Sequence, residues 1–209
     1  MQRNLKFILL LSCIALSLSI AGAAQAKSLV VYFSMPETDK ADNMTEAEDD
    51  STVVINGKVL GNVQYAAQII HSNTDSDIFR IEPKTPYTKN HKDLVSLAHT
   101  EQRENARPEL KSDLTDDKLA QYDVIFLGYP IWWADLPMIV YTFLEAHDMS
   151  GKTIVPFTVH GGSGLAGTPR IIARLQPKAK VVREALSIYR DYMQDSEPVI
   201  IRWLKSIGY

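Results

Sequence analysis

The most constraining feature of the sequence is an apolar run, Val124 to Leu127, followed at once by a loop rich in aromatic residues. A run without polar alternation is typical of a strand buried on both faces, as in a parallel sheet. Gly128 and Pro130 end this strand, and the adjacent Trp132 and Trp133 follow. In open α/β sheets, ligands bind at the carboxyl edge that such a loop occupies. The tryptophans therefore have two interpretations, a core role or a flat wall for an aromatic ligand.

Strand-like and helix-like patterns alternate along the rest of the chain. The expected strands are residues 28–33, 76–82, 123–128, 153–159 and a fifth within 179–187. The expected helices are residues 63–71, a segment around 94–98, 138–146, 170–175 and 198–207. This alternation indicates an α/β fold in which helices cover both faces of a parallel sheet.

Residues 35–60 interrupt the alternation, between the first strand and the first helix. Residues 39–50 are rich in acids and are expected to form an exposed loop. Residues 52–60 predict a β-hairpin, because Asn56-Gly57 suits a type I′ turn between two short strands. The first βα connection is therefore expected to carry a small hairpin insertion.

The N-terminal 26 residues have the pattern of a signal peptide. Arg3 and Lys6 give a positive start, residues 7–21 are mainly apolar, and Ala24-Gln25-Ala26 is a small-residue cleavage signal. We expect cleavage after Ala26 and a periplasmic or secreted protein, with residues 27–209 forming one domain. The apolar run is short for a membrane span, and no span is expected in the mature chain. A lipoprotein site at Cys13 fits less well, because it would leave too short an apolar run.

Composition excludes several classes of function. The chain has 22 basic and 25 acidic residues and no basic patch, so nucleic acid is not an expected partner. Its single cysteine, Cys13, lies in the expected leader, which leaves no thiol nucleophile or disulfide in the mature chain. The histidines lack metal-ligand spacing, and no metal site is expected. We expect His71, His91, His99 and His147 at the surface or as caps, and Glu37 and Asp39 in solvent.

Two further loops at the same sheet edge carry binding signals. Ser34 ends the first strand, and the next helix opens with Gly61, Asn62, Val63 and Gln64, where Asn62 is the expected N-cap. A helix N-terminus can bind an anion through its free N–H groups. The loop after the fourth strand is glycine-rich, which permits close backbone approach to a ligand or, alternatively, a flexible turn; it consists of His160, Gly161, Gly162, Ser163 and Gly164.

Together these blocks resemble the flavodoxin family, and most closely its branch with an insertion in the phosphate-binding loop. The resemblance extends over residues 28–209 and rests on residues 32–34, 61–62, 79–83, 128–133 and 160–164. It implies a sheet of order 2-1-3-4-5 and noncovalently bound FMN.

The resemblance also implies a role for each loop. Ser34 and residues 61–64 would hold the phosphate, although Val63 replaces the family's usual threonine and removes one hydroxyl. Residues 160–164 would border the polar edge of the isoalloxazine, with glycine where relatives often have an acid. The residues expected along the ring are Pro130, Ile131, Trp132 and Trp133, and Tyr87 could also approach it.

We therefore expect an exported, FMN-binding electron-transfer protein with no catalytic side chain of its own, because the flavin performs the redox step. Within this class, an electron carrier that docks on a redox protein competes with an NAD(P)H-dependent reductase of quinone-like acceptors. Two tryptophans over the ring would leave little room for nicotinamide, which favours the carrier. A hypothesis of another class is a flavodoxin-like binding module without flavin, motivated by Val63 and by the export route.

Overall fold

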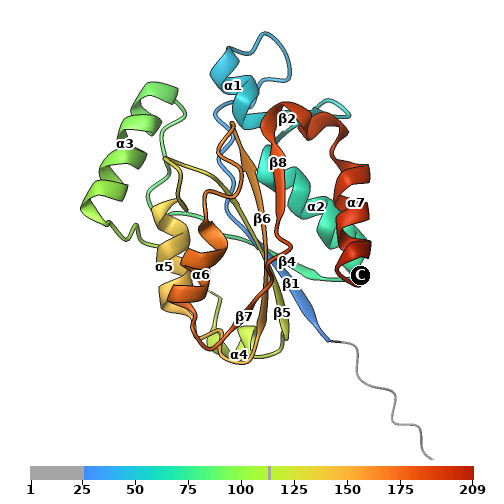
Figure 1. The fold of residues 1–209 in the computed structure, drawn as a ribbon. Coiled ribbons are helices and arrows are strands. Elements are labelled where there is room, and N and C mark those ends of the chain that lie inside the picture. The colour runs from blue at the N-terminus through green and yellow to red at the C-terminus, as the bar shows by residue number, and fades with distance from the viewer. Residues whose placement is uncertain (1–25, 113) are drawn as a thin grey trace, which may run out of the picture.

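The protein is described here by a computed structural model, covering residues 26–112 and 114–209. A central parallel sheet has the strand order β4-β1-β5-β6-β7, which confirms the expected order 2-1-3-4-5 (Figure 1). Its main strands are β1 (Ser28–Tyr32), β4 (Asp77–Arg80), β5 (Val124–Pro130) and β6 (Thr153–His160). The proposed signal peptide lies outside the described residues, apart from residue 26.

The fifth strand position is occupied by two short strands rather than by one. β7 (Lys180–Val181) pairs with the start of β6, and β8 (Leu186–Tyr189) pairs with its end. Between them, the Glu184 carbonyl accepts a hydrogen bond from the Trp203 indole at 2.7 Å. The prediction of a fifth strand within 179–187 is confirmed by β7, and β8 is a second short strand at the same position that the sequence did not predict.

Helices cover both faces of the sheet (Figure 1). α2 (Asn62–Thr74) and α7 (Glu197–Ser206) lie on one face. α3 (His91–Glu104), α5 (Met138–Ala146) and α6 (Thr168–Leu175) lie on the other. These are the five expected helices. The short helix α4 (Asp116–Leu119) and the 3₁₀ helix η1 (Arg190–Asp195) lie in connections.

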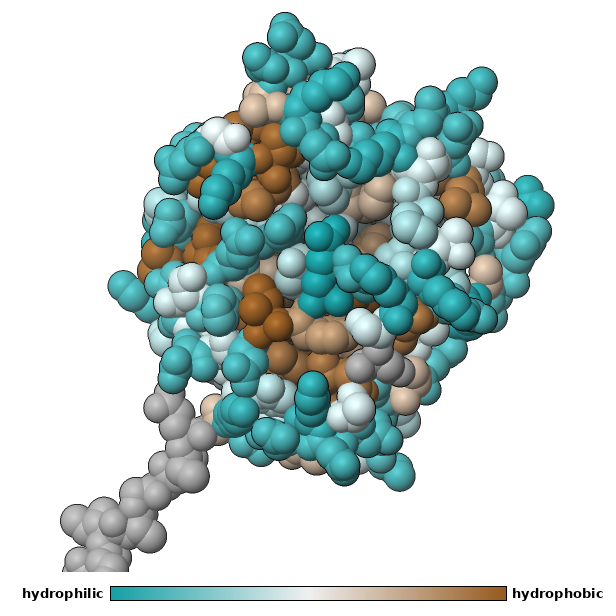
Figure 2. Space-filling model, turned by 180° about the vertical axis from the view of Figure 1, so that it is seen from behind, coloured by the Kyte–Doolittle hydropathy of each residue, from teal (hydrophilic) through white to brown (hydrophobic). Residues whose placement is uncertain are grey.

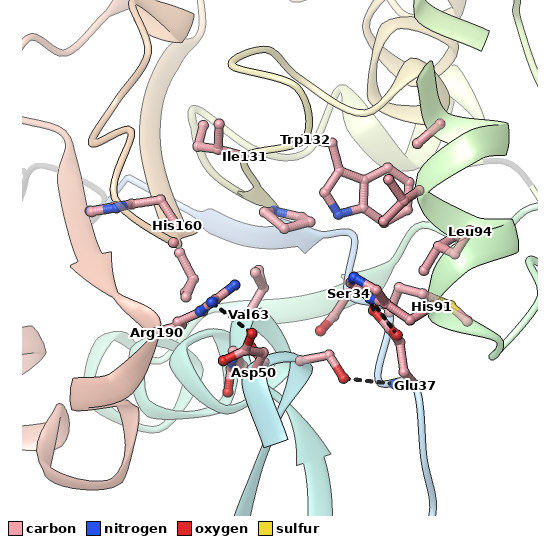
Figure 3. A pocket seen from close by; sticks show the side chains of 18 of the residues that line it. Ser34, Glu37, Asp50, Val63, His91, Leu94, Ile131, Trp132, His160 and Arg190 are labelled. Atoms are coloured by element: carbon pink, nitrogen blue, oxygen red, sulfur yellow. Dashed lines mark hydrogen bonds and ion pairs between the residues drawn. The ribbon is translucent and has the colours of Figure 1, made fainter. Parts of the chain in front are cut away.

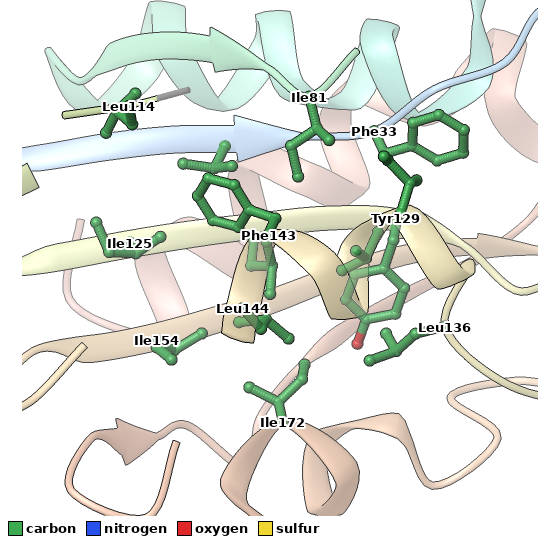
Figure 4. Packing of buried hydrophobic residues seen from close by; sticks show 14 of the residues in the cluster. Phe33, Ile81, Leu114, Ile125, Tyr129, Leu136, Phe143, Leu144, Ile154 and Ile172 are labelled. Atoms are coloured by element: carbon green, nitrogen blue, oxygen red, sulfur yellow. The ribbon is translucent and has the colours of Figure 1, made fainter. Parts of the chain in front are cut away.

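The apolar core consists of two layers separated by the sheet. One layer joins α5 and α6 to the sheet, and its buried members include Phe143, Leu144, Ile172 and Tyr129 (Figure 4). The other joins α2 and α7 to the sheet, with Ala66, Ile70 and Ile200 fully buried. Burial on both faces accounts for the continuous apolar run that predicted β5.

The insertion after β1 consists of a helix and a hairpin. β2 (Thr52–Ile55) and β3 (Lys58–Gly61) pair antiparallel, and Asn56 and Gly57 have φ values of 50° and 76°, which confirms the hairpin and its type I′ turn. The expected loop at 39–50 was wrong in part, because Glu46–Ser51 form α1. A capping box made by Thr45 and Glu48 starts this helix.

The face shown in Figure 2 is largely hydrophilic, with separate hydrophobic patches. Within residues 26–112 and 114–209, no helix is both long enough and apolar enough to cross a bilayer.

Candidate functional site

A cavity of about 270 Å³ opens at the carboxyl edge of the sheet. It lies between α3, the tryptophan loop after β5 and the N-terminus of α2, and it is also lined by Asp50 of α1 (Glu46–Ser51) and Arg190 of η1 (Figure 3). Its position is the one that sequence reasoning assigned to a ligand, because the ends of β1, β5 and β6 meet there.

Nine of the sequence-predicted site residues line this cavity: Ser34, Asn62, Val63, Pro130, Ile131, Trp132, Trp133, His160 and Gly161. Five others belong to the same loops but do not line it: Gly61, Gln64, Gly162, Ser163 and Gly164. The structure therefore brings the three expected loops together, and the glycine-rich loop contributes only its first two residues to the wall.

Trp132 forms the inner part of the apolar wall. Its ring contacts Phe33 and Tyr87 edge-on, at centroid distances of 5.4 Å and 5.6 Å. Both partners are buried, and the Tyr87 hydroxyl donates a hydrogen bond to Glu101 at 2.9 Å. Burial raises the pKa of Glu101, although the Tyr87 hydrogen bond opposes this shift. Tyr87 thus packs behind Trp132, where it supports the wall instead of lining the cavity.

Trp133 forms the outer part of the wall and is 49% exposed. Trp133 has a φ of 50° and Ala134 has a φ of 56°, so the backbone of both residues is in the left-handed region. Two backbone hydrogen bonds between Trp132 and Asp135 close a two-residue turn around them. Non-glycine residues in this conformation store strain and persist where the surroundings hold them.

Helix α3 supplies the contacts that hold this turn. The Trp133 indole donates to the Val95 carbonyl at 3.1 Å, and its ring stacks on His99 at 4.3 Å. The Gln102 amide donates to the Trp133 carbonyl at 3.1 Å. His99 is therefore engaged with the tryptophan loop.

The polar end of the cavity begins at Ser34 and the N-terminus of α2. Ser34 is 3% exposed, and its hydroxyl has no hydrogen-bond partner among the described residues. Its carbonyl accepts from Arg80 at 3.1 Å, which ties the end of β1 to β4. A Cβ at Gly61 would lie 2.2 Å from the Ser34 hydroxyl, so only glycine allows these two segments to approach so closely.

The N-cap of α2 is Gly61, and the expectation that Asn62 caps the helix was wrong. No side chain caps the first-turn N–H groups at this end, while Gln64 accepts from the Gly61 N–H at 3.3 Å. The Asn62 amide donates instead to the Asp50 carbonyl at 2.8 Å, which ties α2 to α1. Asn62 is 6% exposed, and its Oδ1 is a buried acceptor with no hydrogen-bond partner among the described residues. Both features leave hydrogen-bonding capacity for a ligand.

Two ion pairs flank this polar end (Figure 3). His91 of α3 lies 3.0 Å from the Glu37 carboxylate, and Arg190 of η1 lies 2.6 Å from that of Asp50. Burial raises the pKa of Glu37 against the opposing effect of His91. Burial likewise raises the pKa of Asp50 against that of Arg190. The expectation that Glu37 is solvated was wrong, because the residue is only 9% exposed.

Sequence reasoning missed Asp50 and Arg190 as cavity residues, and it placed His91 at the surface without a role. These residues reach the cavity from α1, η1 and α3, which are far apart in the chain. No local pattern connects them. Glu37 did carry a signal, because it lies three residues after Ser34 in the loop expected to bind phosphate.

The His160 loop closes the remaining side of the cavity. The His160 Nδ1 accepts from the Gly162 N–H at 2.9 Å, and burial lowers the pKa of His160. The Arg190 guanidinium lies against Gly161, where an added Cβ would come within 2.9 Å of its Nη1. The cavity thus combines an aromatic wall with a polar end, which suits a flat ring carrying a polar tail.

Comparison with known proteins relates the chain to flavodoxin and to flavoproteins. A family model described as Flavodoxin matches residues 51–195. A search of curated proteins finds no match. Among solved structures, a candidate flavoprotein from Bacteroides eggerthii is 28% identical, with a TM-score of 0.64 over 88% of this chain and 99% of its own. Another, from Bacteroides uniformis, is 26% identical, with a TM-score of 0.58 over 81% and 96%.

A more distant structure shares the fold. A flavoprotein in complex with FMN from Lactobacillus acidophilus is 16% identical, with a TM-score of 0.53 over 83% of this chain and 99% of its own.

Proposed function

The chain belongs to the flavodoxin family, and on that premise we propose that it is an exported flavoprotein that binds FMN in the described cavity and transfers electrons. Family membership supports FMN as the cofactor. The observation that carries the assignment to this cavity is the pairing of the aromatic wall with an uncapped helix N-terminus across one opening.

The residues present fit the two ends of FMN. Ser34 has a free hydroxyl beside the uncapped N-terminus of α2, and such a terminus binds phosphate through backbone N–H groups. The unpartnered Asn62 Oδ1 is an acceptor, which suits a hydroxyl donor such as those of a ribityl chain. Trp132 and Trp133 offer indole surface to an isoalloxazine. When bound, the flavin supplies the redox chemistry, and the protein orients it and excludes water.

The electron carrier is the role we prefer within this function. The wall residue Trp132 is held from behind by two buried aromatic rings, and Trp133 is held by three contacts to α3. A wall that is held in place in this way does not move aside readily to admit a nicotinamide ring beside a flavin. This arrangement favours a redox partner protein over NAD(P)H as the electron donor.

Two assays separate the three candidate roles. Titration of FMN with the protein tests flavin binding, and failure to bind would support the flavin-free module. With FMN bound, we expect no faster oxidation of NADH or NADPH in the presence of a soluble quinone than free FMN gives. Rapid, saturable oxidation would assign the protein to the reductase class instead.

Export is part of the proposal and rests on the sequence of residues 1–26 alone. An exported, initially unfolded chain would acquire FMN after translocation. A cavity at the surface edge of the sheet, as found here, is accessible to a cofactor that arrives after folding.

A further inference from the structure

Two carboxylates lie at the end of the cavity where the proposed function places the FMN phosphate. Glu37 is the more deeply placed, since its side chain is 9% exposed and that of Asp50 is 24% exposed. Glu37 follows Ser34 in the same loop, and its N–H donates to the Ser51 hydroxyl at 2.9 Å. This hydrogen bond fixes the Glu37 main chain, and the carboxylate itself is held by its burial and by the contact with His91.

The positive charges at this end are already engaged. Arg190 is paired with Asp50 at 2.6 Å, and an arginine keeps its charge at all relevant pH values. The groups that face Glu37 are the His91 imidazole from α3 and the carboxylates of Glu48 and Asp50 from α1. Among the described residues, His91 is the ion-pair partner of Glu37, and neither Arg190 nor Arg80 pairs with its carboxylate. A phosphate dianion entering here therefore meets an excess of negative charge.

We propose that Glu37 is a specificity-determining residue of the flavin site, which couples binding of a phosphorylated flavin to uptake of a proton by the Glu37–His91 pair. The inference rests on the proposed function. The proton comes from solvent and is held either on His91, as an ion pair, or on Glu37 itself. Riboflavin, which lacks the phosphate, brings no charge and takes up no proton.

The direction of the pH dependence follows from linkage. Burial already raises the pKa of Glu37, and a nearby dianion favours the protonated pair further. The complex with FMN therefore holds more protons than the free site, so the affinity for FMN increases as the pH falls. For one linked proton, the dissociation constant rises by at most about tenfold per pH unit. Affinity for riboflavin is expected to stay constant over the same interval.

The test is calorimetric titration of the flavin-free protein with FMN and, separately, with riboflavin. Titrations at pH 7.5 in buffers of different ionisation enthalpy give the number of protons taken up. This pH lies above the second phosphate pKa of about 6, so free FMN is mainly a dianion. We expect net uptake of up to one proton for each FMN and none for riboflavin, together with an FMN affinity that falls between pH 7.5 and 8.5.

One variant and its control show whether Glu37 is needed for the proton uptake. Glu37→Gln is expected to abolish the uptake and to tighten FMN at pH 8.5, with riboflavin affinity unchanged. Asp39→Asn is the matched control, because Asp39 lies in the same segment with a side chain that is 85% exposed and paired with Lys89. This variant is expected to behave like the parent.

Failure of this inference can be distinguished from failure of the proposed function. If FMN binds the parent without proton uptake, or if Glu37→Gln retains the uptake, the inference is wrong while FMN binding stands. If neither flavin binds the parent, the proposed function fails and the inference fails with it. The comparison of FMN with riboflavin uses only the parent protein, so absence of the proton uptake overturns the inference even if a variant does not fold.

Discussion

At the scale of the single residue, replacement of Ser34 is expected to weaken phosphate binding without affecting folding. Ser34 lines the cavity, and its hydroxyl makes no hydrogen bond to another described residue, so Ser34→Ala removes no internal hydrogen bond. We expect the variant to bind FMN more weakly by about 1.5–3 kcal/mol, the contribution of a hydrogen bond to a charged group. Its affinity for riboflavin and its melting temperature should stay close to those of the parent. Equal FMN affinities of variant and parent would show that Ser34 is not a phosphate ligand.

The two tryptophans are expected to differ when each is replaced by alanine. Trp132 packs on the buried rings of Phe33 and Tyr87, so Trp132→Ala should lower stability by about 3 kcal/mol, the low end for loss of a large aromatic side chain. Trp133 is 49% exposed, and its loss should cost less.

Flavin emission then shows which tryptophan touches the ring, because indole stacked on a flavin quenches its fluorescence. At least one of the two variants should restore emission from bound FMN or weaken its binding. Thermal melts and FMN titrations of both variants provide the comparison. If both bind FMN as tightly as the parent with emission still quenched, the loop is part of the core and the flavin site lies elsewhere.

At the scale of the element, α3 holds the tryptophan loop. Gln102 connects the helix to the Trp133 carbonyl, at a turn whose backbone is left-handed at two residues. Gln102→Ala should therefore destabilise the protein by about 1 kcal/mol, as expected for one hydrogen bond, and weaken FMN binding through a less ordered wall. Gln121→Ala is the control, because Gln121 makes a comparable exposed bond to the Asp117 carbonyl in α4, away from the cavity. Equal FMN affinities of the two variants would argue that α3 does not position the loop.

The elements that sequence reasoning predicted well are those whose signal is local. The apolar run of β5, the 3.6-residue period of α5 and the Asn56-Gly57 turn each specify their structure within a few residues. The fifth strand position is divided into β7 and β8, and the chain between them accepts a hydrogen bond from Trp203 of α7, a contact that no local pattern shows. α1 was hidden by its acidic composition, although Thr45 and Glu48 form a recognisable capping box.

The features of the site also divide into those that the local sequence predicts and those that it does not. The three loops were predictable, because parallel strands deliver their carboxyl ends to one edge of the sheet. The ion pairs were not, since Glu37 and Asp50 find their partners in His91 and Arg190, which other elements bring to the cavity. Side-chain pairing across the fold follows from packing, and packing is set by the whole chain.

At the scale of the whole molecule, the proposed export predicts which residue forms the N-terminus of the mature chain. If the protein is secreted and processed after Ala26, the mature chain begins at Lys27. The mass of the intact exported protein, or its N-terminal sequence, should identify Lys27 as the first residue. A lipid-modified Cys13 at the N-terminus would instead establish a lipoprotein.

The central claim is that the folded chain binds FMN at the carboxyl edge of its sheet. The most direct measurement is the visible absorption spectrum of the purified protein, before and after FMN is added and the excess removed. We predict one retained FMN per chain, with a spectrum displaced from that of free FMN and with quenched flavin emission. A protein that is folded by circular dichroism yet retains no FMN, and leaves the spectrum and emission of added FMN unchanged, would contradict the account.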